Sequence, residues 1–223
     1  TEPLRIGVLT APAIIDDVDV HEACLRAVER AADLLRGLGH EVASAPAPFP
    51  PSRWDPFRSV WAVLAGTLPL PPGADAGLTP LTRWLRHQSD AVSGVQYAQA
   101  LAGVQQLTRE TADAWRDVDL VLTPTLAQPP APVGSLRDDA DPASDFDAQT
   151  RFTPWTSVYN LTGRPAISLP LHRESVGGTE LPLGVMLGGR LGDEATLLSV
   201  AAALEAADYV FVFTTLQDIQ AEQ

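Results

Sequence analysis

The residues best suited to chemistry gather in one stretch, Phe152 to Pro170, between a loop and a strand-like segment. It combines several hydroxyl side chains, the amide of Asn160, the aromatic residues Trp155 and Tyr159, and a Gly163-Arg164-Pro165 turn. Hydroxyl and amide groups form hydrogen bonds, and aromatic rings supply apolar contact area. The stretch therefore predicts either a structural corner with satisfied polar groups or one wall of a ligand pocket.

Several other catalytic patterns are missing from the sequence. All 15 basic residues are arginine, so a lysine base, a Schiff base and a P-loop lysine cannot come from these residues. There is no Gly-x-Ser-x-Gly nucleophile elbow and no His-Glu-x-x-His. The run Gly37 to Val42 begins like a dinucleotide-binding fingerprint but follows a helical pattern, so we interpret its glycines as a helix stop. A hydrolase using Ser157 and His172 stays a remote alternative.

No metal or cofactor is predicted. The four histidines are widely spaced, and Cys24 is the only cysteine, which excludes an intrachain disulfide and a thiolate cluster. Five aspartates lie between Asp138 and Asp147. An EF-hand loop beginning at Asp138 would need glycine at its sixth position and glutamate at its twelfth, which are Ala143 and Gln149. A solvated acidic loop is the better interpretation.

Composition narrows the class of partner. The 223 residues are 45% hydrophobic and 19% charged, which is typical of a globular domain, and the net charge is −13. Such an acidic chain is a poor match for nucleic acid or an anionic membrane surface. No apolar run reaches the roughly 18 residues of a membrane span, and no signal peptide is recognisable at the start. With one cysteine, these features favour a reducing, cytoplasmic compartment.

The elements that must position these residues alternate between strands and helices. Residues 4–9 and 41–45 are predicted as strands, and the helix between them should begin at Asp19 as N-cap, with Glu22 completing a capping box, and stop at Gly37. Strand, helix and strand in about forty residues favour an α/β sheet. The other expected elements are helices at 53–66, 79–92 and 95–116, a buried strand at 119–123, a long loop at 124–150, a short helix within 152–161, paired strands at 165–170 and 183–187, a last helix capped by Asp193, and an extra strand at 209–213.

Taken together, these residues resemble the amidase signature family. The run Tyr159-Asn160-Leu161-Thr162-Gly163-x-Pro165-Ala166-x-Ser168-x-Pro170 is similar to that family's late core motif. Matching runs stand in the family's order before and after it, at 4–9, 37–42, 119–125, 181–189 and 194–205. The resemblance implies a mixed-sheet α/β core flanked by helices, incomplete because it corresponds to the C-terminal half of an amidase. We therefore expect one α/β domain over residues 1–223, with an atypical tail at 208–223.

The resemblance also implies where catalysis comes from. The family's Gly/Ser-rich signature, with its nucleophilic serine, its cis-peptide serine and its lysine, precedes the part that this chain resembles, so we expect no catalytic residue here. The parent activity would be hydrolysis of a small-molecule amide by a Ser-cisSer-Lys mechanism, with this chain supplying the sheet and part of the acyl pocket. Gln128, Trp155 and Tyr159 are the residues expected to bind the substrate.

Two organisations of the protein remain open at this point. In the first, the chain works with a missing N-terminal half or associates with itself, because an apolar face and an edge near Ile6, Ile167 and Val185 should be exposed. In the second, it is a stand-alone, non-catalytic binding or structural module derived from an amidase half. The sequence does not identify the amide substrate or the role of the tail.

Overall fold

The computed structural model describes residues 2–207, and the expected strand at 209–213 and the tail at 208–223 lie outside them. Five strands form one mixed sheet in the order β2-β1-β3-β5-β4. The strands are β1 (Arg5–Val8), β2 (Glu41–Ser44), β3 (Leu120–Pro124), β4 (Ala166–Val176) and β5 (Thr179–Gly188). Strands β1, β2 and β3 run parallel, and β5 is antiparallel to both of its neighbours. The α/β class predicted from the sequence is confirmed.

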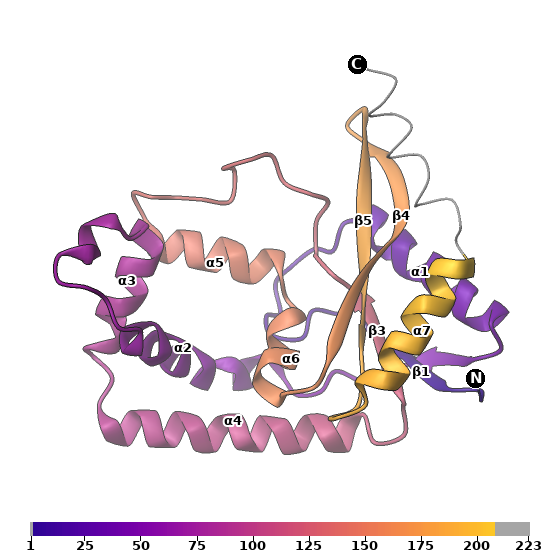
Figure 1. The fold of residues 1–223 in the computed structure, drawn as a ribbon, viewed down its shortest axis with the longest axis horizontal. Helices are drawn as coiled ribbons and strands as arrows, with labels where there is room; N and C mark the ends of the chain where they lie inside the picture. Colours follow the sequence, from indigo (N-terminus) through magenta and orange to yellow (C-terminus); the bar gives the residue numbers. More distant parts are fainter. Residues whose placement is uncertain (1, 208–223) are drawn as a thin grey trace.

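Helices cover both faces of this sheet (Figure 1). On one side lie α1 (Glu22–Gly37) and α7 (Glu194–Ala207). The other side carries the longer run of helices, which are α2 (Pro56–Thr67), α3 (Pro80–Ser89), α4 (Gly94–Ala114), α5 (Pro142–Phe152) and α6 (Thr156–Thr162). Short 3-10 turns at Pro51–Trp54 and Ala74–Gly77 join the segments around α2.

Alternation along the central strands builds a core on each face. In β3, the side chains of Leu120 and Leu122 join the core beneath α1 and α7, whereas Val121 joins the core beneath α4 and α6. All five β3 residues are buried. Ile6 and Val185 are also buried, and β1 and β5 are paired on both sides. The expectation of an exposed apolar face at Ile6 and Val185 is therefore wrong, and among the described strands the sheet edges are β2 and β4.

The first helix begins later than its sequence pattern suggested. His21, and not Asp19, is the N-cap of α1, and its Nδ1 accepts from the Ala23 backbone N–H at 3.1 Å. The preceding backbone is held against the loop after β3, because Gln128 Nε2 donates to Asp19 O and His21 N donates to Ala127 O. This tertiary anchoring overrides the capping-box pattern. The predicted stop at Gly37 is confirmed.

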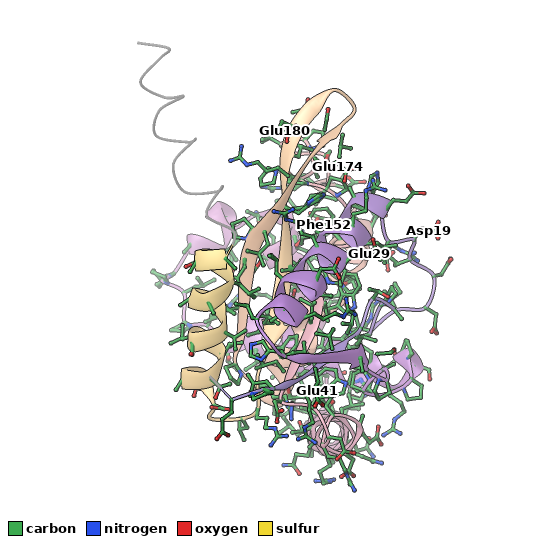
Figure 2. The ribbon with its side chains drawn as sticks, turned by 90° about the vertical axis from the view of Figure 1, so that its right-hand side faces the viewer. Asp19, Glu29, Glu41, Phe152, Glu174 and Glu180 are labelled. Atoms are coloured by element: carbon green, nitrogen blue, oxygen red, sulfur yellow. The ribbon has the colours of Figure 1, made fainter. Side chains whose placement is uncertain are left out.

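The long loop is shorter than predicted, because residues 142–152 form α5. Asp141 caps this helix by accepting from Ala143 N and Ser144 N, and Pro142 occupies its first turn. Its apolar periodicity is weak, since the one fully buried side chain along it is the polar Asp145. Within residues 2–207, the other predicted helices and strands are present with shifted ends. The β4–β5 hairpin is longer than expected and turns at Gly177 and Gly178, both with positive φ, and Figure 2 shows Glu180 near its tip.

Candidate functional site

Helix α6 has two faces with opposite roles. Trp155, Val158, Tyr159 and Thr162 are buried and attach the helix to the sheet, whereas Thr156, Ser157 and Asn160 point away from that core. This division follows from helical spacing, because residues three and four apart share a face. The helix ends at Gly163, which has a φ of +68°. The buried face of this segment is therefore a structural corner, and its other face is turned away from the core.

The buried face of α6 is anchored tightly. The indole N–H of Trp155 donates to Ala11 O at 2.8 Å. The Tyr159 ring stacks near Trp115, with ring centroids 6.1 Å apart, and lies directly over the backbone of Gly188 in β5. Only a residue without a side chain fits there, because a Cβ at Gly188 would stand 2.5 Å from Tyr159 Oη. The orientation of α6 is thus set by contacts with the sheet.

The opposite face of α6 lines a cavity of about 300 Å³ between α2, α3, α5 and α6, which we call the helical cavity. One wall is aromatic and aliphatic, and the other carries hydroxyl and amide groups. Its lining residues are Phe57, Trp61, Leu81, Thr82, Leu85, Phe146, Gln149, Thr150, Thr153, Thr156, Ser157 and Asn160. None of these side chains is charged. Such a mixture of apolar surface and a few polar groups is typical of a small-molecule site.

Part of the polar wall is free to bind a ligand. The hydroxyls of Thr150 and Thr153 donate to Phe146 O and Gln149 O within α5. The side chains of Thr156, Ser157 and Asn160 have no hydrogen-bond partner within residues 2–207, so they can donate to or accept from a bound molecule. A smaller cavity of about 260 Å³ shares Leu85 and Phe146 with the helical cavity and is lined on one side by Arg58.

The three substrate-binding residues expected from the sequence are not brought together. Trp155 and Tyr159 are 1% and 4% exposed and lie on the buried side of α6, behind the helical cavity. Burial also raises the pKa of the Tyr159 hydroxyl, which has no hydrogen-bond partner among the described residues. Gln128 lines a separate groove of about 730 Å³ between the loop at 128–136, His21 and the β4–β5 hairpin.

Sequence reasoning missed the residues that do line the helical cavity. Thr153, Ser157 and Asn160 stand three or four positions apart, opposite Trp155 and Tyr159. That spacing indicates a polar helix face turned away from the core, so the sequence alone could have identified these three residues. The apolar residues on α2 and α3 had no such signal, because they come from a distant part of the sequence.

Residues of three separate motifs meet on β3, β4 and β5. The hydroxyls of Thr125 and Ser168 are 2.7 Å apart and hydrogen-bonded. Gly184 lies beneath them, where a Cβ would stand 2.9 Å from Thr125 Oγ1. Within residues 2–207, no histidine, carboxylate or arginine is hydrogen-bonded to this pair, so the described residues supply no base that would activate either hydroxyl as a nucleophile.

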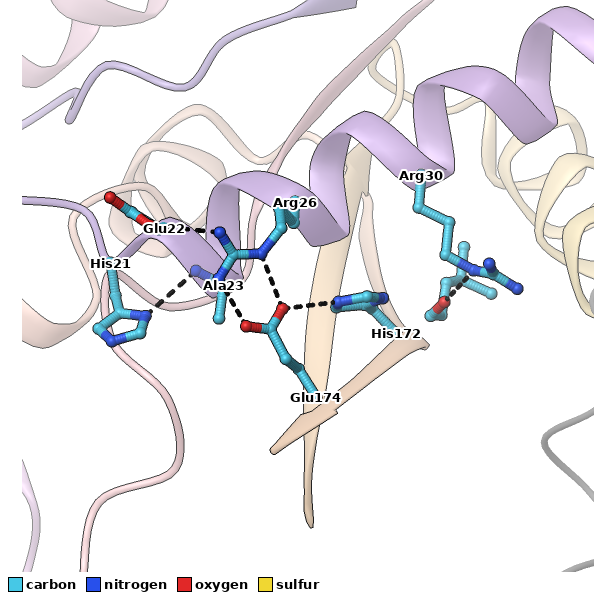
Figure 3. A network of polar contacts seen from close by, with 8 residues as sticks. His21, Glu22, Ala23, Arg26, Arg30, His172 and Glu174 are labelled. Carbon is cyan, nitrogen blue, oxygen red and sulfur yellow. Dashed lines mark hydrogen bonds and ion pairs between the residues drawn. The ribbon is translucent and has the colours of Figure 1, made fainter. Parts of the chain in front are cut away.

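Other titratable groups form structural contacts. Glu174 on β4 accepts two bonds from Arg26 on α1, at 2.9 and 2.5 Å, and His172 Nε2 lies 3.1 Å from its Oε2 (Figure 3). Hydrogen bonds from Arg26, then from His172, lower the pKa of Glu174 to about 2. His172 lies in this network and Ser157 lines the helical cavity, so the structure does not bring them together as a hydrolase pair.

The aspartates between 138 and 147 likewise form local hydrogen bonds and ion pairs. Asp138 accepts from the backbone N–H groups of Ala140 and Asp141, and Asp139 pairs with Arg137. Asp147 pairs with Arg151 at 2.8 Å. These contacts account for most of the acidic side chains between 138 and 147, and within residues 2–207 no group of three or more His, Cys, Asp or Glu is arranged to hold a metal ion.

Comparison with known proteins gives a consistent picture. The family model described as Amidase matches residues 1–198. The chain is 35% identical over 187 residues to the "Putative amidase AmiC" of Mycobacterium leprae, covering 80% of this chain and 39% of the relative. It is 31% identical over 210 residues to the "2-amino-5-chloromuconic acid deaminase" of Comamonas testosteroni, covering 91% and 43%. The chain thus spans about two fifths of the length of these curated relatives.

A solved structure agrees with the sequence relatives. The fold matches that of 6-aminohexanoate cyclic dimer hydrolase with a TM-score of 0.75 and 26% identity, over 92% of this chain and 45% of the other. A bacterial aryl acylamidase matches at a TM-score of 0.62 and 18% identity, which shows a shared fold.

Proposed function

Because this chain belongs to the amidase family, we propose that it takes part in hydrolysis of a small-molecule amide, with the helical cavity as one wall of the substrate pocket. One observation carries the proposal. The late core motif around Asn160 turns its unpaired polar side chains into a cavity whose other wall is aromatic. A substrate can bury an apolar part against the rings while its polar part bonds to α6.

The proposal divides the reaction between two sets of residues. These 223 residues contain no lysine, and no charged side chain lines the helical cavity, so the proton transfer must be done elsewhere. We propose that the Ser-cisSer-Lys groups come from residues outside this sequence. There, a neutral lysine takes the proton of the nucleophilic serine through the bridging serine while that serine attacks the carbonyl. The C–N bond then breaks and the amine leaves with that proton, and water cleaves the acyl-enzyme ester to release the acid. Alone, this chain is proposed to be inactive.

The three residues predicted from the sequence keep a place in this proposal. Trp155 and Tyr159 hold α6 from behind, so that the polar side chains of its other face stay at the pocket wall. Gln128 lies on a separate groove and fixes the segment before α1 through its bond to Asp19 O. We propose that it meets a more distant part of the substrate.

A comparison of this chain alone with an assembled enzyme tests the proposal. Hydrolysis of small aliphatic and aryl amides is measured for the chain alone and after joining it to the N-terminal part of the M. leprae relative. We expect turnover in the joined protein only, blocked by a fluorophosphonate that labels a serine outside these 223 residues. Serine-dependent turnover by the chain alone would falsify the proposal that the catalytic residues lie outside this sequence. Ser157→Ala in the joined protein is the control for the fluorophosphonate label, because it removes the one serine that lines the helical cavity. Labelling that persists in this variant is on another serine.

The alternative is a stand-alone, non-catalytic module, and one observation favours it. The chain's own helices cover the sheet on both faces, with one core beneath α1 and α7 and another beneath α4 and α6. Such a chain can fold alone. Cooperative thermal melting of a monomer that binds no hydrophobic dye, together with no gain of activity on joining, would support the module.

The partner and the compartment are proposals as well. We propose that a strand from the N-terminal half, or from a second copy, pairs with the free edge of β4 near Ile167. Sedimentation at several concentrations tests self-association. The single, buried Cys24 is in keeping with a cytoplasmic location, and no helix in residues 2–207 is long and apolar enough to cross a membrane.

A further inference from the structure

Asp145 lies in the first turn of α5, where the helix dipole favours a carboxylate, but it is buried there with one side-chain hydrogen bond among the described residues. Its side chain is 1% exposed, and its Oδ1 accepts from Gln149 Nε2 at 2.6 Å. Its Oδ2 is buried with no hydrogen-bond partner among the described residues. The nearby Arg137 donates to Asp139 instead. A buried carboxyl costs free energy unless it is hydrogen-bonded, so its single bond to Gln149 calls for a role.

The bond to Asp145 determines how the Gln149 amide is turned. A carboxylate accepts hydrogen bonds, so the amide must present Nε2 to it, and Oε1 is directed away from it. Gln149 lines the helical cavity. Gln149 is an exposed residue, and its bond to Asp145 favours one direction for Oε1, which accepts no hydrogen bond from residues 2–207.

The opposite wall indicates what such an acceptor would meet. Phe57 and Trp61 on α2 are stacked, with ring centroids 5.2 Å apart, and Phe146 lies beside Gln149 on the cavity lining. Aromatic surface favours a flat apolar group, and a lining without charge leaves a charged group without compensation for its lost hydration. An acceptor at Gln149 favours a hydrogen-bond donor at the edge of that group.

We propose that Asp145 is a positioning residue which holds Gln149 Oε1 as an acceptor, so that the helical cavity selects an uncharged aromatic group carrying an N–H or O–H donor. This inference rests on the proposed function of the helical cavity as part of the substrate pocket. It adds the class of group recognised there and the residue that sets the preference.

Equilibrium binding to the purified chain tests this without any catalytic step. Phenol and anisole are a matched pair, because both are small, aromatic and uncharged, but only phenol donates a hydrogen bond. We expect phenol to bind more tightly by about three- to ten-fold, the range of one uncharged hydrogen bond. The ligand-induced shifts in an NMR spectrum should map to the lining of the helical cavity.

Two variants and one control identify the cause. Asp145→Asn can present either an oxygen or an N–H to Gln149, so the preference for phenol should fall to about two-fold or less. Gln149→Met removes the acceptor at similar length and should abolish the preference. Asp147→Asn, on the same helix but half-buried and paired with Arg151, should leave the preference unchanged. The side-chain N–H resonances of Gln149 should move in Asp145→Asn and stay in place in Asp147→Asn.

Each outcome decides the inference. A preference that survives in either Asp145→Asn or Gln149→Met overturns it, and so does equal binding of the two probes, or no binding of either, by the unmodified chain. If Asp145→Asn does not fold, Gln149→Met decides alone. Lost preference in the variants, with amide hydrolysis absent from the joined enzyme, would overturn the proposed function and leave the binding preference standing.

Discussion

The contact between Gly188 and Tyr159 connects the sheet to the candidate site, and substitution of Gly188 by alanine tests it. The added Cβ would stand 2.5 Å from Tyr159 Oη and closer still to the ring carbons Cε1 and Cζ. Carbon atoms make ordinary contacts at about 3.5–4.0 Å. The ring must therefore retreat by at least about 1 Å, in a core where Trp115 and the rest of α6 already surround it.

We expect Gly188→Ala to lower the free energy of unfolding by about 3 kcal/mol, at the upper end of the usual cost of overpacking. The measurement is urea denaturation followed by circular dichroism. Gly189→Ala is the matched control, because a Cβ there would stand 3.3 Å from Pro165 Cγ and needs only a small adjustment.

A second substitution separates the ring contact from a general weakness of β5. In a double-mutant cycle, Tyr159→Leu should recover at least about 1 kcal/mol in the Gly188→Ala background. Equal stability of Gly188→Ala and Gly189→Ala, or additive effects in the cycle, would refute the argument that this contact sets the position of α6.

Three further predictions use the same chain. Tyr159→Phe removes a buried hydroxyl that has no hydrogen-bond partner among the described residues, so the free energy of unfolding should stay level or rise by about 1 kcal/mol. A loss larger than about 1 kcal/mol in urea denaturation would indicate that the hydroxyl has a hydrogen-bond partner. Arg26 and His172 lower the pKa of Glu174 to about 2. The stability that this network contributes is therefore present above about pH 4.5 and lost as the pH falls toward 2. The free energy of unfolding measured against pH should show this fall, and Glu174→Gln should make the pH dependence flatter. Burial, with a further contribution from Glu174, raises the pKa of the Cys24 thiol to about 11. Iodoacetamide at pH 8 should therefore modify the folded protein at least about 100-fold more slowly than the urea-unfolded chain. Comparable rates would contradict the burial of this thiol.

The sequence predicted local elements better than long-range placement. The strands around Ile6 and Val121, the helix stop at Gly37 and the paired strands at 165–170 and 183–187 follow from alternation and glycine chemistry, which act over a few residues. The N-cap was misplaced because Gln128, more than a hundred residues away, holds the backbone at Asp19. No local pattern carries that information.

Helix α5 and the free edges were missed for related reasons. The buried side of α5 includes Asp145, whose polarity hides the helix from a search for apolar periodicity. Which strands lie at an edge depends on their order in the sheet, and the placement of β5 between β3 and β4 buries Val185, which had been expected on an exposed surface.

Helix α6 shows how one short segment can combine a structural role with a polar surface at a cavity. On α6, the buried aromatics Trp155 and Tyr159 set the position of the helix, and the polar residues between them set what it presents. The pattern therefore marks Trp155 and Tyr159 as important without saying which side of the helix meets a ligand. An uncharged cavity recognises a substrate but cannot move its protons, since that needs a group that changes its charge. In the proposed function, recognition and proton transfer are therefore joined across an interface, and we expect displacement of α6 to change substrate affinity before it changes the chemistry of the nucleophile.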